Sequence, residues 1–183
     1  MRHKYVTRAI VLARAPLAES ASLITLLTEE FGLVRARAEG LRKPGAKLAH
    51  ALQTLDACEV TLVRGKEGWR LSGALLVRSW FKELSHDARA RAGRVAGLLL
   101  RLVHGEAADA LLYGIYAQFL ESLPALTEEE QDAAECFAAL RLLAALGLDA
   151  GAIPDDRGYA PLAPEERRAL VTRINHGIAA SGL

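Results

Sequence analysis

The spacing of apolar residues changes near residues 82–85, and this change limits what the chain can fold into. The stretch LVRARAE (33–39) alternates apolar and charged residues, which is the period of a β-strand with one buried face. Residues 111–120 instead repeat apolar side chains every three or four positions, which is the period of an amphipathic helix. The sequence therefore predicts an α+β protein with a β domain at 1–82 and a helical domain at 83–183.

The first domain contains short strand-like segments separated by turn signals. The predicted strands are residues 5–14, 22–28, 33–39, 58–64 and 69–77. The glycine-containing turns EEFG (29–32) and GKEG (65–68) are typical of hairpin connections. Five strands with a long loop after the third favour a small closed barrel of the OB type, although periodicity alone leaves other five-stranded barrels open.

The second domain carries helix start and stop signals. Ser85 is positioned to cap a first helix, and Thr127 and Glu130 have the spacing of a capping box. Gly147 is a natural helix stop and is followed by a predicted loop at about 149–164. The chain then ends in a short predicted helix. Its apolar side is formed by Leu170, Ile174 and Ile178.

The formal net charge of +1 conceals a division between the two halves. Residues 1–84 hold 14 Lys and Arg against 8 Asp and Glu, whereas residues 85–183 hold 9 against 14. The first half is therefore suited to face a polyanion, and the second half is not.

A basic, acid-free loop tip follows the third predicted strand. Residues 40–50 hold Arg42, Lys43 and Lys47 around a Pro44-Gly45 pair. Proline limits the freedom of such a loop and glycine lets backbone approach phosphate closely. With Arg35 and Arg37 on the outward face of the preceding strand, these side chains predict a track for the phosphates of DNA, which Lys and Arg bind by releasing counterions. A loop charged only for solubility is the alternative.

The second hairpin adds weaker candidates for the same track. Arg64, Lys66 and Arg70 flank its turn, and a merely solvated hairpin is an equally good interpretation. Trp69 is the best candidate for stacking on a base, although packing against the hairpin is the favoured prediction.

The sequence contains no constellation that indicates an enzyme. There is no P-loop, nucleophile elbow or HExxH motif, so no catalytic residue and no cofactor are expected. Cys58 and Cys136 are far apart, which predicts neither a disulfide framework nor a metal site and fits a reducing cytoplasm. We expect no membrane span, because no apolar run approaches about 20 residues. The Arg-rich start is predicted to be a strand and not an export peptide.

The run AIVLARAPLAESASLITLLTEEFGLVRARAEGLRKPGAKLAHALQ (9–53) resembles the N-terminal barrel of the bacterial recombination mediator family RecO. The resemblance rests on ES, LLT, the turn at Gly32, the AxG at 38–40 and the basic RKP, which occur in that family's order and spacing. The segment LRLLAALG (140–147) is similar to a helix of the same family. The last 35 residues carry little of the pattern, and the four-cysteine zinc site of some members is absent.

The resemblance implies a non-catalytic DNA-repair protein of the cytoplasm, associated with the nucleoid. Its members bind single- and double-stranded DNA, anneal complementary strands, and work with RecR to replace single-strand-binding protein with the RecA recombinase. The family's helical domain receives the acidic C-terminal tail of single-strand-binding protein, for which Arg141 within the apolar 140–147 helix is our candidate contact. Two alternatives remain: an adaptor whose basic loop binds an acidic protein, and an unrelated nuclease.

Overall fold

The computed structural model of this chain describes residues 3–17, 21–39, 51–106, 110–153 and 158–182. The chain divides into two compact units, which are described separately below. The first comprises residues 1–83 together with 104–113, and the second comprises 84–103 and 114–183. We call them the barrel unit and the helical unit. The predicted division into functional domains at 82/83 stays a prediction.

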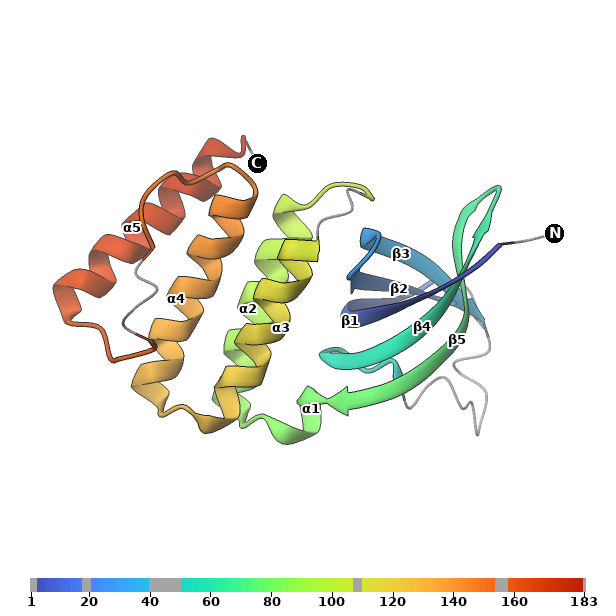
Figure 1. Ribbon diagram of the computed structural model, residues 1–183, viewed down its shortest axis with the longest axis horizontal. Coiled ribbons are helices and arrows are strands. Elements are labelled where there is room, and N and C mark those ends of the chain that lie inside the picture. The colour runs from blue at the N-terminus through green and yellow to red at the C-terminus, as the bar shows by residue number, and fades with distance from the viewer. Residues whose placement is uncertain (1–2, 18–20, 40–50, 107–109, 154–157, 183) are drawn as a thin grey trace. The chain divides into compact units, whose positions relative to one another are not determined.

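The barrel unit is a closed five-stranded barrel. Its strands are β1 (Lys4–Pro16), β2 (Ala21–Thr28), β3 (Gly32–Glu39), β4 (Asp56–Gly65) and β5 (Gly68–Ser79). They are hydrogen-bonded in the order β1-β2-β3-β5-β4, and β4 returns to β1 (Figure 1). Every pair is antiparallel except β3 and β5, which are parallel. This confirms the predicted OB-type barrel followed by helices.

The barrel encloses a core of aliphatic side chains supplied by alternate strand positions. In β3, Val34, Ala36 and Ala38 are fully buried, while Arg35 and Arg37 between them are exposed. The other strands add Val11, Ile24, Leu26, Val60 and Leu62 to this core cluster, although β2 is buried at almost every position and does not alternate. Burial of these apolar side chains is what holds the strands in register, because a shift by one residue would turn the charged face inward.

Both predicted hairpin turns depend on glycines in the left-handed region of backbone conformation. Gly32 has φ 65° and Gly68 has φ 105°, values that residues with a Cβ rarely adopt. The first turn is further held by Thr28, whose hydroxyl donates to the carbonyl oxygen of Gly32 at 2.8 Å and accepts from the backbone N–H of Phe31 at 3.0 Å. The hairpins therefore form where the glycine signals predicted them.

Two of the helices begin at the predicted capping signals, and the last described helix follows its N-cap residue Ala163 without a side-chain cap. They are α1 (Trp80–Glu83) in the barrel unit, then α2 (His86–Leu102), α3 (Ala110–Ser122), α4 (Glu128–Ala145) and α5 (Pro164–Ala180), with a 3-10 turn at Leu123–Ala125. The hydroxyl of Ser85 accepts from Ala88 N at 3.2 Å, and Thr127 and Glu130 form a reciprocal capping box. Gly147 has φ 72° just after α4. The short helix α1, which continues directly from β5, was not predicted.

In the helical unit, α4 packs between α2 and α5 (Figure 1). Ten of its residues are buried, including Phe137, Leu140 and Leu143, so this helix forms the centre of the unit's core. Tyr116 of α3 is fully buried, and its hydroxyl donates to the carbonyl oxygen of Ala92 in α2 at 3.0 Å. The apolar face predicted at 111–120 is buried at Leu112, Tyr116, Phe119 and Leu120 but exposed at Leu111, and the buried Tyr116 hydroxyl has its partner.

Candidate nucleic-acid interface

The exposed arginines of β3 lie next to the start of β5. In the parallel register of these strands, Arg37 is opposite Arg70 and Ala36 is opposite Trp69. Both Arg37 and Arg70 are exposed, so two cations from strands distant in the sequence lie side by side on the outer surface. The sequence indicated both arginines, but not that they would be neighbours.

All five predicted basic residues that the structure describes line one open groove on the barrel, with a volume of about 970 Å³. We call it the barrel groove. Its basic residues are Arg35, Arg37, Arg64, Lys66 and Arg70. Leu17, Leu23, Val63 and Trp69 contribute apolar surface, and Glu39 and Glu67 are its acidic members. Five cations against two carboxylates make this a positively charged groove, which is the electrostatic condition for attracting a phosphate chain.

The other three predicted residues, Arg42, Lys43 and Lys47, lie outside the described residues, so their role stays a prediction. The chain enters their segment directly after Glu39, which itself lines the barrel groove.

The cations of the groove differ in their partners. Nε of Arg37 lies 3.3 Å from the carboxylate of Glu39, and Nη1 of Arg64 lies 2.5 Å from both carboxylate oxygens of Glu106. Arg35, Lys66 and Arg70 form no ion pair with any carboxylate in the described ranges. Exposed ion pairs contribute about 1 kcal/mol at most, so the two paired arginines are also within reach of a competing anion.

Trp69 is a packing residue, as favoured by the sequence, and not a free stacking platform, although its aromatic partners come from β1 and the β2–β3 turn and not from its own hairpin. Its side chain is 8% exposed and its ring centroid lies 5.5 Å from that of Tyr5 and 5.4 Å from that of Phe31. The guanidinium of Arg64 lies over the indole, 4.8 Å from the ring centroid. The tryptophan therefore forms part of the floor beneath the groove and touches one of its cations.

Glu106, which pairs with the groove residue Arg64, is the partner of this site that the sequence did not predict. It is 42 positions from Arg64, in the segment that follows α2, and nothing in its local sequence marks it. The pairing arises because residues 104–113 belong to the barrel unit although they come after a helix of the other unit.

Arg141 was predicted as a docking residue in the helical unit. It is half-buried on α4, between the buried residues Leu140 and Leu142 in the sequence, and it is not without a partner. The position fits an arginine whose stem packs on apolar neighbours. Its role in docking stays a proposal.

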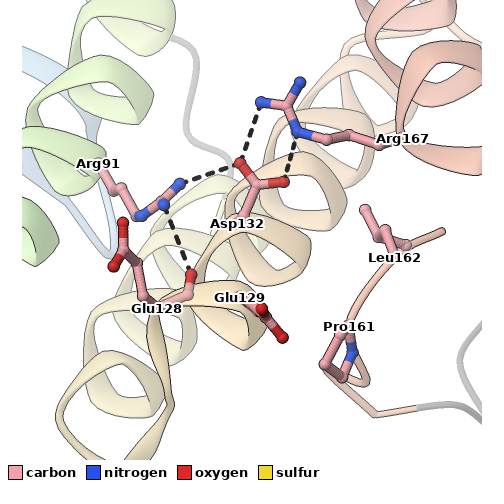
Figure 2. Close-up of a pocket in the computed structure, with 7 residues that line it drawn as sticks. All are labelled: Arg91, Glu128, Glu129, Asp132, Pro161, Leu162 and Arg167. Atoms are coloured by element: carbon pink, nitrogen blue, oxygen red, sulfur yellow. Dashed lines mark hydrogen bonds and ion pairs between the residues drawn. The ribbon is translucent and has the colours of Figure 1, made fainter. Parts of the chain in front are cut away.

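A second concavity, in the helical unit, has a volume of about 480 Å³ and is built around an ion-pair network. Figure 2 shows Arg91 of α2 and Arg167 of α5 both reaching Asp132 of α4. Nη1 of Arg91 lies 3.2 Å from an Asp132 oxygen and 3.0 Å from Glu135, and Nε of Arg167 lies 2.7 Å from Asp132. These charges pair with one another across three helices, and we interpret the network as structural, although the buried Nε of Arg91 has no hydrogen-bond partner among the described residues.

The part of the chain that forms the barrel groove is similar to a known protein family. Residues 1–80, which span the barrel strands, match the family described as "Recombination protein O N terminal". Residues 1–80 belong to the recombination protein O family. The RecO assignment covers the strands and the second hairpin, and with them every residue that lines the barrel groove.

Several curated RecO proteins resemble the chain beyond the barrel. A protein of Gloeobacter violaceus named "DNA repair protein RecO" is 34% identical over 78% of this chain and 55% of its own length. Proteins of the same name from a Cyanothece strain and from Dehalococcoides mccartyi are each 29% identical, over 94% and 70% of this chain and over 55% and 51% of their own lengths. The chain thus spans about half the length of the curated relatives it matches.

None of the helices in the described ranges is both long enough and apolar enough to cross a bilayer. The same ranges hold no cluster of three or more His, Cys, Asp or Glu side chains arranged to bind a metal ion.

Proposed function

We propose that this chain is a non-catalytic DNA-binding protein of recombination and repair, and that its barrel groove holds the phosphates of DNA. One observation carries the proposal: five basic side chains from β3 and the β4–β5 hairpin converge on one groove. This groove lies on the face of strands 2 and 3, next to the loop between strands 4 and 5, where OB barrels bind oligonucleotides.

The composition of the groove favours strand annealing. Arg and Lys hold DNA by its phosphates, and such contacts position a strand without reading or covering its bases. The groove's one aromatic side chain, Trp69, is buried, so bound bases would remain available to a complementary strand. Deep stacking of bases would have the opposite effect.

The proposal extends to the basic loop after β3 and to two protein partners. Arg42, Lys43 and Lys47 would extend the phosphate track from the groove, on single- or double-stranded DNA. The helical unit, through Arg141, would receive the C-terminal tail of single-strand-binding protein, and the protein would act with RecR in the cytoplasm, at the nucleoid. The support for these parts is the resemblance to RecO together with the acidic charge of residues 85–183, which is unsuited to a second DNA surface.

A salt titration of DNA binding tests the groove. We expect the logarithm of the affinity for a single strand to fall with the logarithm of salt concentration by roughly 0.7 per neutralised phosphate. Changing Arg35, Arg37 and Arg70 together to Gln should weaken binding to all sequences about equally and flatten this slope. Changing Arg42, Lys43 and Lys47 to Ala should do the same if the loop takes part.

The matched control removes three exposed cations that do not line the groove, Lys82, Arg101 and Arg168. If this control flattens the slope as much as the groove variant, binding depends on net charge and the groove has no special role. An annealing assay with and without single-strand-binding protein then separates the functions. Equal affinity for DNA and a simple polyanion without annealing would favour the adaptor, and metal-dependent cleavage would favour a nuclease.

A further inference from the structure

One cation of the barrel groove, Arg64, is paired with a carboxylate that does not itself line the groove, that of Glu106. Nη1 of Arg64 donates to both carboxylate oxygens of Glu106 at 2.5 Å, while the same guanidinium lies over Trp69. A DNA phosphate would offer Arg64 the same kind of partner, a pair of negatively charged oxygens. Glu106 therefore holds Arg64 in the manner in which a phosphate would.

The Arg64–Glu106 ion pair is exposed enough for a phosphate to replace Glu106 on Arg64. The side chain of Arg64 is 48% exposed and that of Glu106 is 41% exposed, so neither charge is locked in the interior. An ion pair of this exposure is weak, whereas a phosphate entering the groove would also meet Lys66 and Arg70. Exchange of one anion for the other thus costs little and places a phosphate among several cations.

The two carboxylates that line the groove are placed differently from Glu106. Glu39 belongs to β3 and pairs with Arg37 two residues away on the same strand, so the sheet fixes it. Glu67 lies in the β4–β5 turn and forms no ion pair with a described residue. Glu106 comes from outside the strands, directly after Gly105, whose φ of 83° turns the chain there. It can therefore leave Arg64 without breaking any strand pairing.

We propose that Glu106 is a built-in competitor of DNA: its carboxylate occupies the phosphate position on Arg64, and an incoming strand displaces it. Arg64 then moves with the phosphate, and the position of its guanidinium over the Trp69 indole changes. This inference rests on the proposed function, since it names a phosphate of DNA as the competing ligand. It assigns Glu106 a role in setting DNA affinity and makes Trp69 a reporter of the exchange.

Measured affinity for a fluorescent oligothymidine at fixed salt tests the competition. Glu106→Gln removes the competing charge and should tighten binding about two- to fivefold, the range expected for losing an exposed ion pair. Glu67→Gln makes the same charge change in the same groove without touching Arg64, and should tighten binding less. In an Arg64→Gln background the advantage of E106Q over E67Q should disappear. Equal effects of E106Q and E67Q in the wild-type background, or an advantage that persists without Arg64, would overturn the proposal.

A measurement without DNA separates this inference from the proposed function. In a Trp80→Phe background, Trp69 is the remaining tryptophan, and its buried indole N–H has no hydrogen-bond partner among the described residues. E106Q should loosen Arg64 and thereby increase acrylamide quenching of Trp69, and R64Q should increase it further, whereas E67Q should leave it unchanged. If neither E106Q nor R64Q changes the quenching of Trp69, this inference is wrong, and the proposed function is unaffected. Failure of the wild-type protein to bind DNA, with the quenching pattern intact, overturns the proposed function and leaves the Arg64–Glu106 contact established.

Discussion

Arg141 is a half-buried cation on the otherwise apolar end of α4. Its neighbours on α4, Leu140 and Leu142, are fully buried, while Arg141 itself is half-buried. Such a side chain packs its aliphatic stem on the apolar surface and keeps its guanidinium near water. Because both leucines are fully buried, the accessible part of this position is the arginine itself, and the proposed acidic tail of single-strand-binding protein would meet Arg141 through its carboxylates.

Replacing Arg141 by Ala tests this role. We expect binding of a fluorescent tail peptide to weaken by about 1–3 kcal/mol, the scale for losing a charge-assisted hydrogen bond, while DNA binding stays nearly unchanged. Arg168→Ala, which removes an exposed arginine from α5 of the same unit, is the control and should leave both affinities as they are. Equal losses for peptide and DNA, or no loss of either, would reject a separate docking role.

Single residues were predictable where their neighbours in the sequence determine their position. Arg35 and Arg37 alternate with small apolar residues, and that pattern alone places them on the outer face of a strand. The contact of Arg64 with Glu106 was not predictable, because it depends on where residues 104–113 return to the barrel. Side-chain periodicity carries no information about such long-range contacts.

At the scale of elements, α4 is connected electrostatically to both of its neighbours. Asp132 accepts hydrogen bonds from Arg167 of α5 and from Arg91 of α2, and only 12% of the Arg91 side chain is exposed (Figure 2). The hydrogen bond from Arg167, and after it that from Arg91, holds the pKa of Asp132 below its usual value, against the opposing effect of burial. The ionised carboxylate is thus part of what fixes α2 and α5 on α4.

Asp132→Asn should therefore destabilise the protein at neutral pH by about 1–3 kcal/mol, since it removes a carboxylate that accepts charged hydrogen bonds. A lowered pKa means that this stabilisation is fully present above the ordinary pKa of Asp, about 4, and is lost as the pH falls through the folded-state value. Denaturant unfolding at pH 7 and at pH 3 should accordingly show a large difference between wild type and mutant at pH 7 and a smaller one at pH 3.

Asp87→Asn is the control for this measurement, because Asp87 is 72% exposed, lies in the first turn of α2, and its side chain pairs with the exposed His86. It should change stability little at either pH. A D132N difference that is the same at both pH values would show that shape, and not charge, accounts for the loss.

Elements were predictable where a local signal starts or stops them. Ser85 and Thr127 cap their helices because a side-chain oxygen supplies an acceptor for the unpaired N–H groups of the first turn. A stretch of about four residues is enough to predict such a cap. The parallel pairing of β3 with β5 is different, since it follows from closure of the whole barrel. The barrel groove depends on that pairing, so its residues could be named from the sequence but their convergence could not.

For the molecule as a whole, we expect folding and DNA binding to be indifferent to chelators. Burial raises the pKa of Cys58 to about 12 and that of Cys136 to about 11, so both thiols stay protonated at neutral pH and are poor metal ligands. Melting temperature and DNA affinity should be equal with and without EDTA, and metal analysis of the purified protein should find no stoichiometric zinc. A fall in melting temperature on chelation would indicate a structural metal.

The late position of Glu106 in the chain also bears on the order in which the protein is made. The last barrel strand, β5, ends at Ser79, whereas Glu106 follows only after α2. At a synthesis rate of about 5–20 residues per second, roughly one to five seconds separate their emergence from the ribosome. During that interval a nascent barrel would present Arg64 without its carboxylate partner, so the newly made groove is at its most basic in the presence of ribosomal RNA. The carboxylate of Glu106, which competes with polyanions for Arg64, would thus be present only after the chain has been synthesised past α2.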